Sequence, residues 1–153
     1  MKYWIWIPLA ALLLLLPFQG NDVGKLRPVE LVTMGREGGD VVLETDTGDT
    51  GRGDDPLAAM EDLKRSAPGA LFLDTADYFL VTRETESLLP ALSGVLRPAV
   101  EVCVISEETD LEGAAEYLRA HSPEVTLLQW RTQGKALPEL RTEGGEYRLE
   151  FGG

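Results

Sequence analysis

Four aspartates in one short, glycine-containing segment are the first residues of this sequence that could perform chemistry. The segment DTGDTGRGDD (46–55) holds three glycines and four carboxylates, which are Asp46, Asp49, Asp54 and Asp55. Carboxylate oxygens on a flexible loop are the ligands that Ca²⁺ prefers. The EF-hand loop needs Asp or Asn at alternating positions, and here Gly48 and Thr50 occupy them. The pattern favours a solvated acidic loop without a bound metal ion, and a calcium-binding module remains an alternative.

A second pair of aspartates could supply a catalytic carboxylate. Two Asp carboxylates that share a proton form a complete acid–base device. The segment LFLDTAD (71–77) resembles that of retroviral-type proteases, because an apolar strand leads into Asp74 and Asp77. Ala76 stands where those proteases need the glycine of a tight turn, and the helices expected nearby disagree with an all-β protease. We expect no enzyme, with a small hydrolase that uses Asp74 or Asp77 as the alternative.

The chain contains one cysteine and one histidine, which limits the other possible chemistry. A single cysteine excludes an internal disulfide and a multi-cysteine zinc site. Cys103 lies between Val102 and Val104, and an apolar setting makes a thiol inert. His121 follows a predicted helix, where a cation complements the helix dipole. Neither residue indicates a catalytic site, and the sequence predicts no cofactor.

Charge and length narrow the class of partner. The 153 residues include 14 Lys and Arg against 26 Asp and Glu, a net charge of −12. Nucleic-acid binding needs clustered basic side chains, so this balance argues against nucleic acid. Cationic surfaces, metal ions and other proteins are compatible ligands. The length is that of a single domain.

The amino terminus predicts a membrane location. Residues 3–18 read YWIWIPLAALLLLLPF, about 24 Å of uncharged apolar helix, which is short for a bilayer core of about 30 Å. Aromatic residues lie at both ends, as in the aromatic belts of membrane spans: Tyr3, Trp4, Trp6 and Phe18. We expect residues 1–20 to be a membrane anchor, with a cleaved signal peptide and secretion as the alternative. Lys2 places residue 1 in the cytoplasm and the domain 21–153 outside the cell membrane.

Hydrophobic patterning predicts an α/β (α+β) domain with a mixed β-sheet and about three helices, preceded by one amino-terminal membrane helix. The double glycines at 38–39 and 144–145 predict two hairpins. Asp54 or Asp55 is expected to cap a helix that has Pro56 near its first position. Strands are expected at 28–34, 40–46, 99–106 and 125–132, and residues 70–82 are expected to form one bent strand or two short ones. A loop is expected at 47–55, helices after 55 and at 84–97 and 109–118, and a hairpin over 137–151. The strand at 99–106 should be central, and Thr109 to Glu112 should form a capping box.

The order of these segments resembles the amino-terminal domain of the C-subunit lipoproteins of bacterial spore germinant receptors, the Ger(x)C family. The likeness covers residues 26–120. It is carried by LRPVELVTM (26–34), PLAAMEDLKRSAPGALFLDTADYFLVT (56–82), ETESLLPALSGVLRPAVEVCVIS (84–106) and TDLEGAAEYL (109–118). The chain departs from that family because it has no lipobox cysteine near residue 20 and has Asp74-Thr75-Ala76 where the family tends to have a histidine.

The resemblance implies a non-catalytic, membrane-tethered scaffold domain of a spore germination or sporulation complex. Its expected partners are the membrane protein subunits of that complex, together with the lipid bilayer that holds the amino-terminal helix. An anchor raises the effective concentration of an acidic domain toward membrane partners without strong intrinsic affinity. The sequence therefore predicts a single-pass, extracytoplasmic interaction domain.

Overall fold

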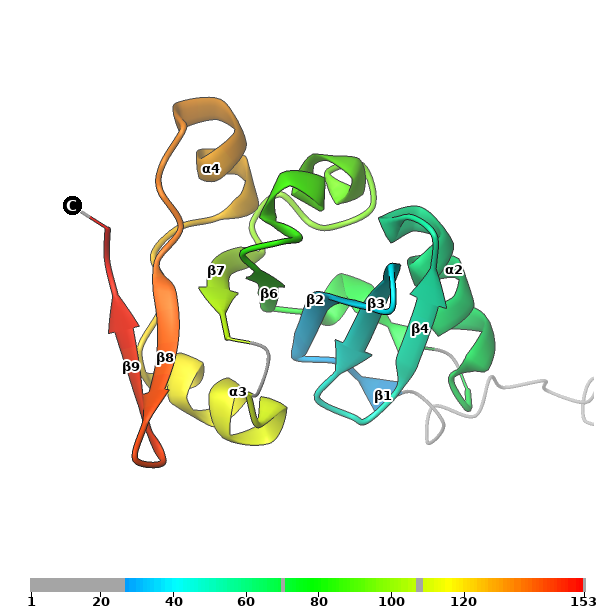
Figure 1. The fold of residues 1–153 in the computed structure, drawn as a ribbon, viewed down its shortest axis with the longest axis horizontal. Helices are drawn as coiled ribbons and strands as arrows, with labels where there is room; N and C mark the ends of the chain where they lie inside the picture. Colours follow the sequence, from blue (N-terminus) through cyan, green and yellow to red (C-terminus); the bar gives the residue numbers. More distant parts are fainter. Residues whose placement is uncertain (1–26, 70, 107–108, 153) are drawn as a thin grey trace, which may run out of the picture.

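The computed structural model describes residues 27–69, 71–106 and 109–152 of the chain. Seven strands form the main sheet: β2 (Leu31–Glu37), β3 (Asp40–Thr45), β4 (Thr50–Gly53), β6 (Tyr78–Thr82), β7 (Glu101–Ile105), β8 (Glu139–Glu143) and β9 (Glu146–Glu150). Their order across the sheet is β4-β3-β2-β6-β7-β8-β9 (Figure 1). The four neighbouring strands β2, β6, β7 and β8 run parallel, and antiparallel pairing adds β3 and β4 at one side and β9 at the other. The predicted mixed α/β sheet is confirmed.

Both predicted hairpins are present. Gly38 and Gly39 connect β2 to β3, and Gly144 and Gly145 connect β8 to β9. All four glycines have positive φ angles, between 60° and 99°. Two consecutive positive φ angles give the turn whose twist matches a tight hairpin. The strand at 101–105 is internal, between β6 and β8, as expected.

The prediction of a loop over 47–55 is wrong in its second half, where β4 forms. This strand is followed by helix α2 (Pro56–Ser66), which packs directly against it. A Cβ atom on Gly51 would lie 2.4 Å from the Ala59 carbonyl oxygen, and one on Gly53 would lie 2.5 Å from the Ala59 nitrogen. The glycines therefore allow the helix backbone to touch the strand. Asp55 caps α2 with its carboxylate, as expected.

Residues 71–82 form two short strands separated by a turn, the second of the two arrangements expected for this segment. Strand β5 (Leu71–Phe72) pairs in parallel with β1 (Arg27–Pro28), and the 3-10 helix η2 (Leu73–Thr75) precedes β6. The predicted helix over 84–97 is a shorter 3-10 helix, η3 (Glu86–Leu92). Pro90 lies inside it and has no N–H to continue an α-helical ladder.

The prediction of a strand over 125–132 is wrong, because Leu127–Gln133 forms helix α4. The Thr126 hydroxyl accepts a bond from the Gln129 N–H, and the Gln129 side chain accepts one from the Thr126 N–H, which completes a capping box. Trp130 therefore packs against the core from a helix and not from the sheet. The predicted capping box at Thr109 is also wrong: Asp110 caps α3 (Leu111–Ala120), accepting from the Gly113 N–H.

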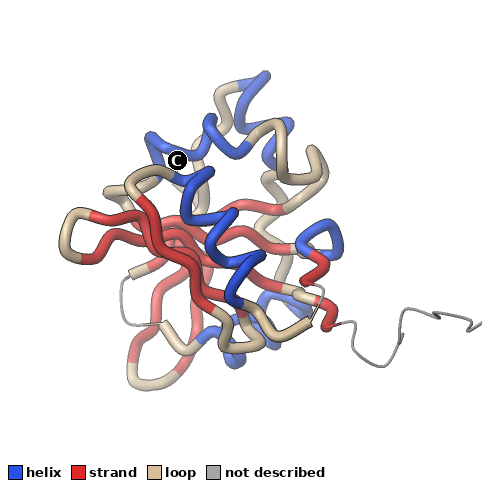
Figure 2. The backbone as a smooth tube through the Cα atoms, turned by 90° about the vertical axis from the view of Figure 1, so that its right-hand side faces the viewer, coloured by secondary structure: helices blue, strands red, loops and turns tan. Residues whose placement is uncertain are grey.

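Helices lie on both sides of the sheet, but unequally (Figure 2). One face packs against α2, η3 and α4. Of the described helices, α3 is the one that packs on the other face, where its Ala114, Ala115 and Leu118 form a buried cluster with residues of β2, β6, β7 and β8. Within the described ranges no helix is long and apolar enough to cross a membrane. The predicted anchor residues Tyr3, Trp4, Trp6 and Phe18 lie outside the described part of the chain.

Candidate functional site

The connections between the parallel strands guide the search for a site. The chain passes from β2 to β6 and from β6 to β7 through α2 and η3, both on one face of the sheet. After β7 it crosses to the other face and forms α3. In open α/β sheets, ligands bind beyond the carboxyl ends of the parallel strands. Here β2, β6, β7 and β8 follow chain order across the sheet, so their common carboxyl edge has no reversal of strand order. The carboxyl ends of β6 and β7 are therefore the place to search.

An open hollow of about 300 Å³ lies at this place. Gly35 and Thr82, from the ends of β2 and β6, form part of its lining, and Ile105 and Leu111 contribute apolar side chains. Three charged residues also line it, which are Arg36, Glu37 and Glu44. The hollow thus combines hydroxyl groups, apolar surface and charges of both signs.

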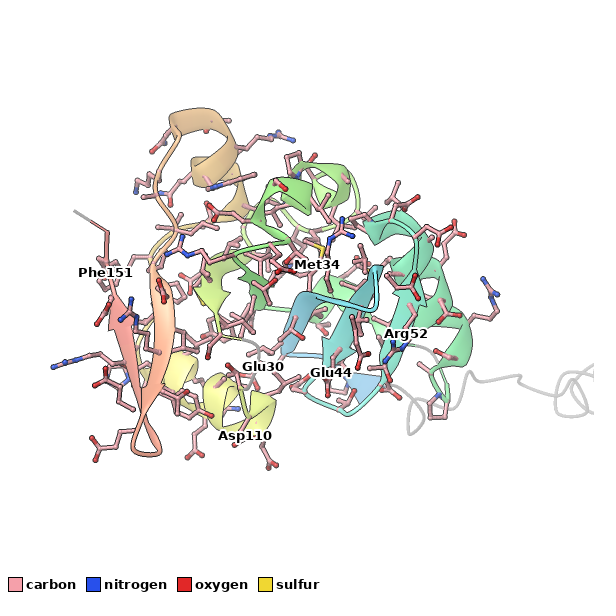
Figure 3. The ribbon with its side chains drawn as sticks, in the orientation of Figure 1. Glu30, Met34, Glu44, Arg52, Asp110 and Phe151 are labelled. Atoms are coloured by element: carbon pink, nitrogen blue, oxygen red, sulfur yellow. The ribbon has the colours of Figure 1, made fainter. Side chains whose placement is uncertain are left out.

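The hollow exists because α3 covers only part of its face of the sheet. Along β3, Val41 and Leu43 are buried against α2, whereas Val42 is half-buried and Glu44 is exposed on the opposite face. The buried cluster that α3 forms on this face includes Leu31 at the start of β2 but no described residue of β3 or β4. Glu44 and Arg52 project from β3 and β4 on this part of the molecule (Figure 3).

Hydrogen bonds fix the lining of the hollow. The Thr85 hydroxyl is fully buried and donates to the Met34 carbonyl at 2.7 Å, which joins η3 to the end of β2. The Thr82 N–H donates to the same hydroxyl at 3.1 Å. The Thr33 hydroxyl donates to the Glu44 carbonyl at 3.4 Å. The ends of β2, β3 and β6 are therefore held together around the hollow.

The charged groups at the hollow differ in their pairing. Glu37 forms an ion pair with Arg52, and the Arg36 guanidinium donates to the Gly39 carbonyl at 2.9 Å. No ion pair joins Glu44 to a cation in the described part of the chain. Glu44 is therefore an exposed carboxylate that can accept hydrogen bonds from a basic ligand.

The four aspartates that formed the alternative calcium site are not brought together. Asp46 and Asp49 lie in the turn before β4, and Asp54 and Asp55 follow its other end. A four-residue strand spans about 13 Å, whereas Ca²⁺ requires all its ligands within about 2.6 Å. Among the described residues, no three His, Cys, Asp or Glu side chains are grouped as a metal site.

The carboxylate of Asp46 is partly buried, unlike those of Asp54 and Asp55. One carboxylate oxygen accepts from the Glu30 N–H at 3.3 Å, and the other, Oδ1, is buried with no hydrogen-bond partner among the described residues. Burial raises the pKa of Asp46. The nearby Arg119 guanidinium, which binds both carboxylate oxygens of Glu30 at 2.7 Å, lowers the pKa of Glu30.

The two aspartates of the alternative hydrolase hypothesis lie away from the hollow. Asp74 is exposed in η2, and Asp77 precedes β6, so both are at the amino end of this strand. Asp77 forms an ion pair with Arg97 at 2.8 Å. The hollow is at the opposite, carboxyl end of β6, where Thr82 lies.

Cys103 and His121 occupy the positions that the sequence indicates. The Cys103 thiol is fully buried in β7, and burial raises its pKa, so the reactive thiolate is disfavoured. His121 ends α3 and stacks on Tyr117, with ring centroids 4.3 Å apart. The His121 Nδ1 lies 3.1 Å from the Tyr117 carbonyl oxygen.

The residues of the hollow were missed at the sequence level. Thr33, Gly35, Thr82 and Thr109 are common residue types with no diagnostic spacing. The sequence signal that could have identified the hollow was the position of Gly35 and Thr82, which lie near the ends of two strands that could be predicted to pair in parallel.

Models of known protein families, curated proteins and solved structures give no match to this chain.

Proposed function

We propose that this protein is a non-catalytic interaction domain, tethered to the outer face of a membrane by its amino-terminal segment, and that the hollow at the carboxyl ends of β2, β6 and β7 is its contact site. The observation that carries this proposal is the half-covered sheet face, which leaves Gly35, Val42 and Glu44 accessible beside the start of α3. A ligand placed there meets backbone, apolar surface and a free carboxylate together.

The chemistry of the hollow favours a protein segment with a basic side chain. Glu44 offers an exposed carboxylate, and Ile105 and Leu111 offer apolar contact. The net charge of −12 attracts a positively charged partner over a longer range and increases the rate of encounter. A membrane protein with a basic extracytoplasmic segment fits these features.

The proposed assembly is a spore germination or sporulation complex. This part of the proposal rests on the order of segments over residues 26–120, which resembles the receptor C-subunit lipoproteins. A tether would confine the domain to the membrane surface, so that a modest contact is sufficient for assembly.

Filling the hollow tests its role. Gly35 has an ordinary φ angle, and a Cβ there would lie 3.6 Å from Thr82 Cγ2, a normal contact distance. The change Gly35→Phe should therefore leave the fold intact while its ring occupies the hollow. We expect co-purification of membrane partners with the full chain to fall at least about tenfold, since about 1.4 kcal/mol of lost contact gives that factor.

Gly94→Phe is the matched control, because a Cβ at Gly94 meets nothing within 4 Å. This variant should recover the same partners as the unaltered chain. Circular dichroism and thermal melting must show that both variants are folded. Equal recovery of partners by both variants would remove the hollow from the proposed contact site.

A further inference from the structure

Strand β9 forms one edge of the main sheet, and no described element pairs with its outer side. The two-residue turn makes Glu143 and Glu146 a hydrogen-bonded pair, and such pairs alternate along an antiparallel ladder. The N–H and C=O groups of Tyr147 and Leu149 therefore point away from β8. In agreement, the Leu149 N–H donates to the Tyr117 hydroxyl of α3 and not to β8.

The charges on this edge are incompletely matched within one copy. Arg148 lies directly opposite Arg141 in the hairpin register. Arg141 binds Glu139 at 3.0 Å and Glu150 at 3.2 Å. Arg148 has no ion pair in the described part of the chain. On the side of β9 away from β8, Arg148 has no neighbouring strand in the described structure. A strand added there with an acidic residue opposite Arg148 would be favoured.

An exposed aromatic side chain lies at the end of the same edge. Phe151 follows β9 and is 57% exposed (Figure 3). Tyr147 packs toward α3, with its ring centroid 5.7 Å from that of Tyr117. Aromatic pairs across neighbouring strands stabilise a sheet, so a partner that covers Phe151 should also place an aromatic ring against it.

From these features we infer that β9 pairs with β9 of a second copy of this chain, antiparallel and with Leu149 on the two-fold axis. This register places Arg148 opposite Glu150 of the second copy and Tyr147 opposite Phe151 of the second copy. Leu149 then meets its own counterpart. The result is a symmetric dimer with one continuous sheet through both copies.

Other registers are less favourable. A two-fold axis at Arg148 places two arginines opposite each other, and an axis at Glu150 does the same with two glutamates. An axis at Tyr147 matches Arg148 with Glu146, but it places Leu149 opposite Gly145 of the turn and leaves Phe151 uncovered. Charged edge residues usually prevent strand addition. Here their alternating signs select one register.

Pairing requires one local exchange. The Leu149 N–H must leave the Tyr117 hydroxyl, which it reaches at 3.3 Å, beyond the usual range for an N–H···O bond. It would then donate to the Leu149 carbonyl of the second copy. The exchange keeps the number of hydrogen bonds from this N–H constant.

Exchanging the charges on β9 tests the proposal in the full chain solubilised in detergent. Sedimentation measures the fraction of dimer at protein concentrations up to about 1 mM, where even weak association is detected. Arg148→Glu places two carboxylates opposite each other between copies and should abolish the dimer. Within one copy it places a carboxylate opposite Arg141, so it should not destabilise the hairpin. The double change Arg148→Glu with Glu150→Arg restores opposite charges and should restore the dimer. Association through the apolar leader would not respond to these changes.

Cysteine cross-linking in native membranes tests the register. Paired residues of this kind have Cα atoms about 5.5 Å apart, within the range of a disulfide. Leu149→Cys should therefore form a covalent dimer on mild oxidation, and Cys103 is buried and does not interfere. Tyr147→Cys, two residues away on the same edge, should not. A chain that stays monomeric, a dimer unaffected by Arg148→Glu, or cross-linking through position 147 and not 149 would overturn the inference.

Discussion

At the scale of single residues, Asp46 is the side chain whose native environment opposes its own charge. Its Oδ1 atom is buried without a partner in the described structure, and the Glu30 carboxylate adds repulsion. Burial is the largest influence and raises the pKa of Asp46, whereas the backbone N–H groups of Leu31 and Glu30 lower it and compensate only in part. An acid whose pKa is higher in the folded state favours folding at low pH, and this contribution is lost as the pH rises through the folded-state pKa.

Replacing Asp46 with asparagine should therefore change the pH dependence of stability. Asparagine cannot ionise, so the melting temperature of Asp46→Asn minus that of the unaltered protein should increase as the pH rises from about 3 to about 7. Glu30 contributes in the opposite direction, because the pKa of Glu30 is lowered by Arg119, but Glu30 is common to both proteins. Thermal melts over this pH range measure the effect.

Asp54→Asn is the control for this measurement. It also removes one negative charge from an acidic protein, but from an exposed position. It therefore reports the general effect of net charge on stability. If the two variants show the same trend with pH, the buried environment of Asp46 has no particular influence.

At the scale of elements, helix α4 shows how local capping overrides a strand-like sequence. The segment VTLLQWRT was predicted as a strand from its apolar and β-branched residues. In the structure, Thr126 and Gln129 satisfy the first free N–H groups, and Gly134 ends the helix with a φ angle of 63°. A helix of seven residues gains little from its own ladder, so its caps and the contact of Trp130 with the core stabilise it.

Removing the amino-terminal cap of α4 should lower stability measurably. Thr126→Ala is expected to reduce the free energy of unfolding by about 1 kcal/mol, the typical cost of losing a capping side chain. Thr132→Ala is the matched control in the last turn of the same helix, where the hydroxyl donates only to the Leu128 carbonyl. Denaturant unfolding should show a clear loss for the first variant and little change for the second. Equal losses would mean that the capping box does not stabilise α4.

The elements also show which parts of the fold the sequence patterns could predict. Consecutive glycines predicted both hairpins, and Asp55 with Pro56 predicted the start of α2, because these signals act within a few residues. Strand β4 was missed because Gly51 and Gly53 indicate a loop until the helix that packs on them is known. The hollow was missed for a similar reason: its lining comes from β2, β3, β6 and the start of α3, which only the sheet topology brings together.

At the scale of the whole molecule, the described domain and the apolar leader suggest complementary roles. The domain provides two surfaces, the hollow beside α3 and the outer edge of β9. Figure 1 shows β9 at one edge of the sheet. A contact through one five-residue strand is small and is expected to be weak in dilute solution. Confinement to a membrane surface raises the effective concentration of both copies and of any partner. The proposed contacts therefore depend on the leader in residues 3–18.

The leader should determine where the protein is found. We expect the full chain to remain with membranes after an alkaline carbonate wash, because an uncleaved apolar segment inserts in the bilayer, and a variant without residues 3–18 to be released. The proposed orientation, with Lys2 on the cytoplasmic side, predicts that protease added outside intact spheroplasts digests the domain while a cytoplasmic marker protein survives. Mass spectrometry of the amino terminus distinguishes this anchor from a cleaved signal. An intact chain in the soluble cytoplasmic fraction would contradict both the tether and the effective concentration on which the weak contacts depend.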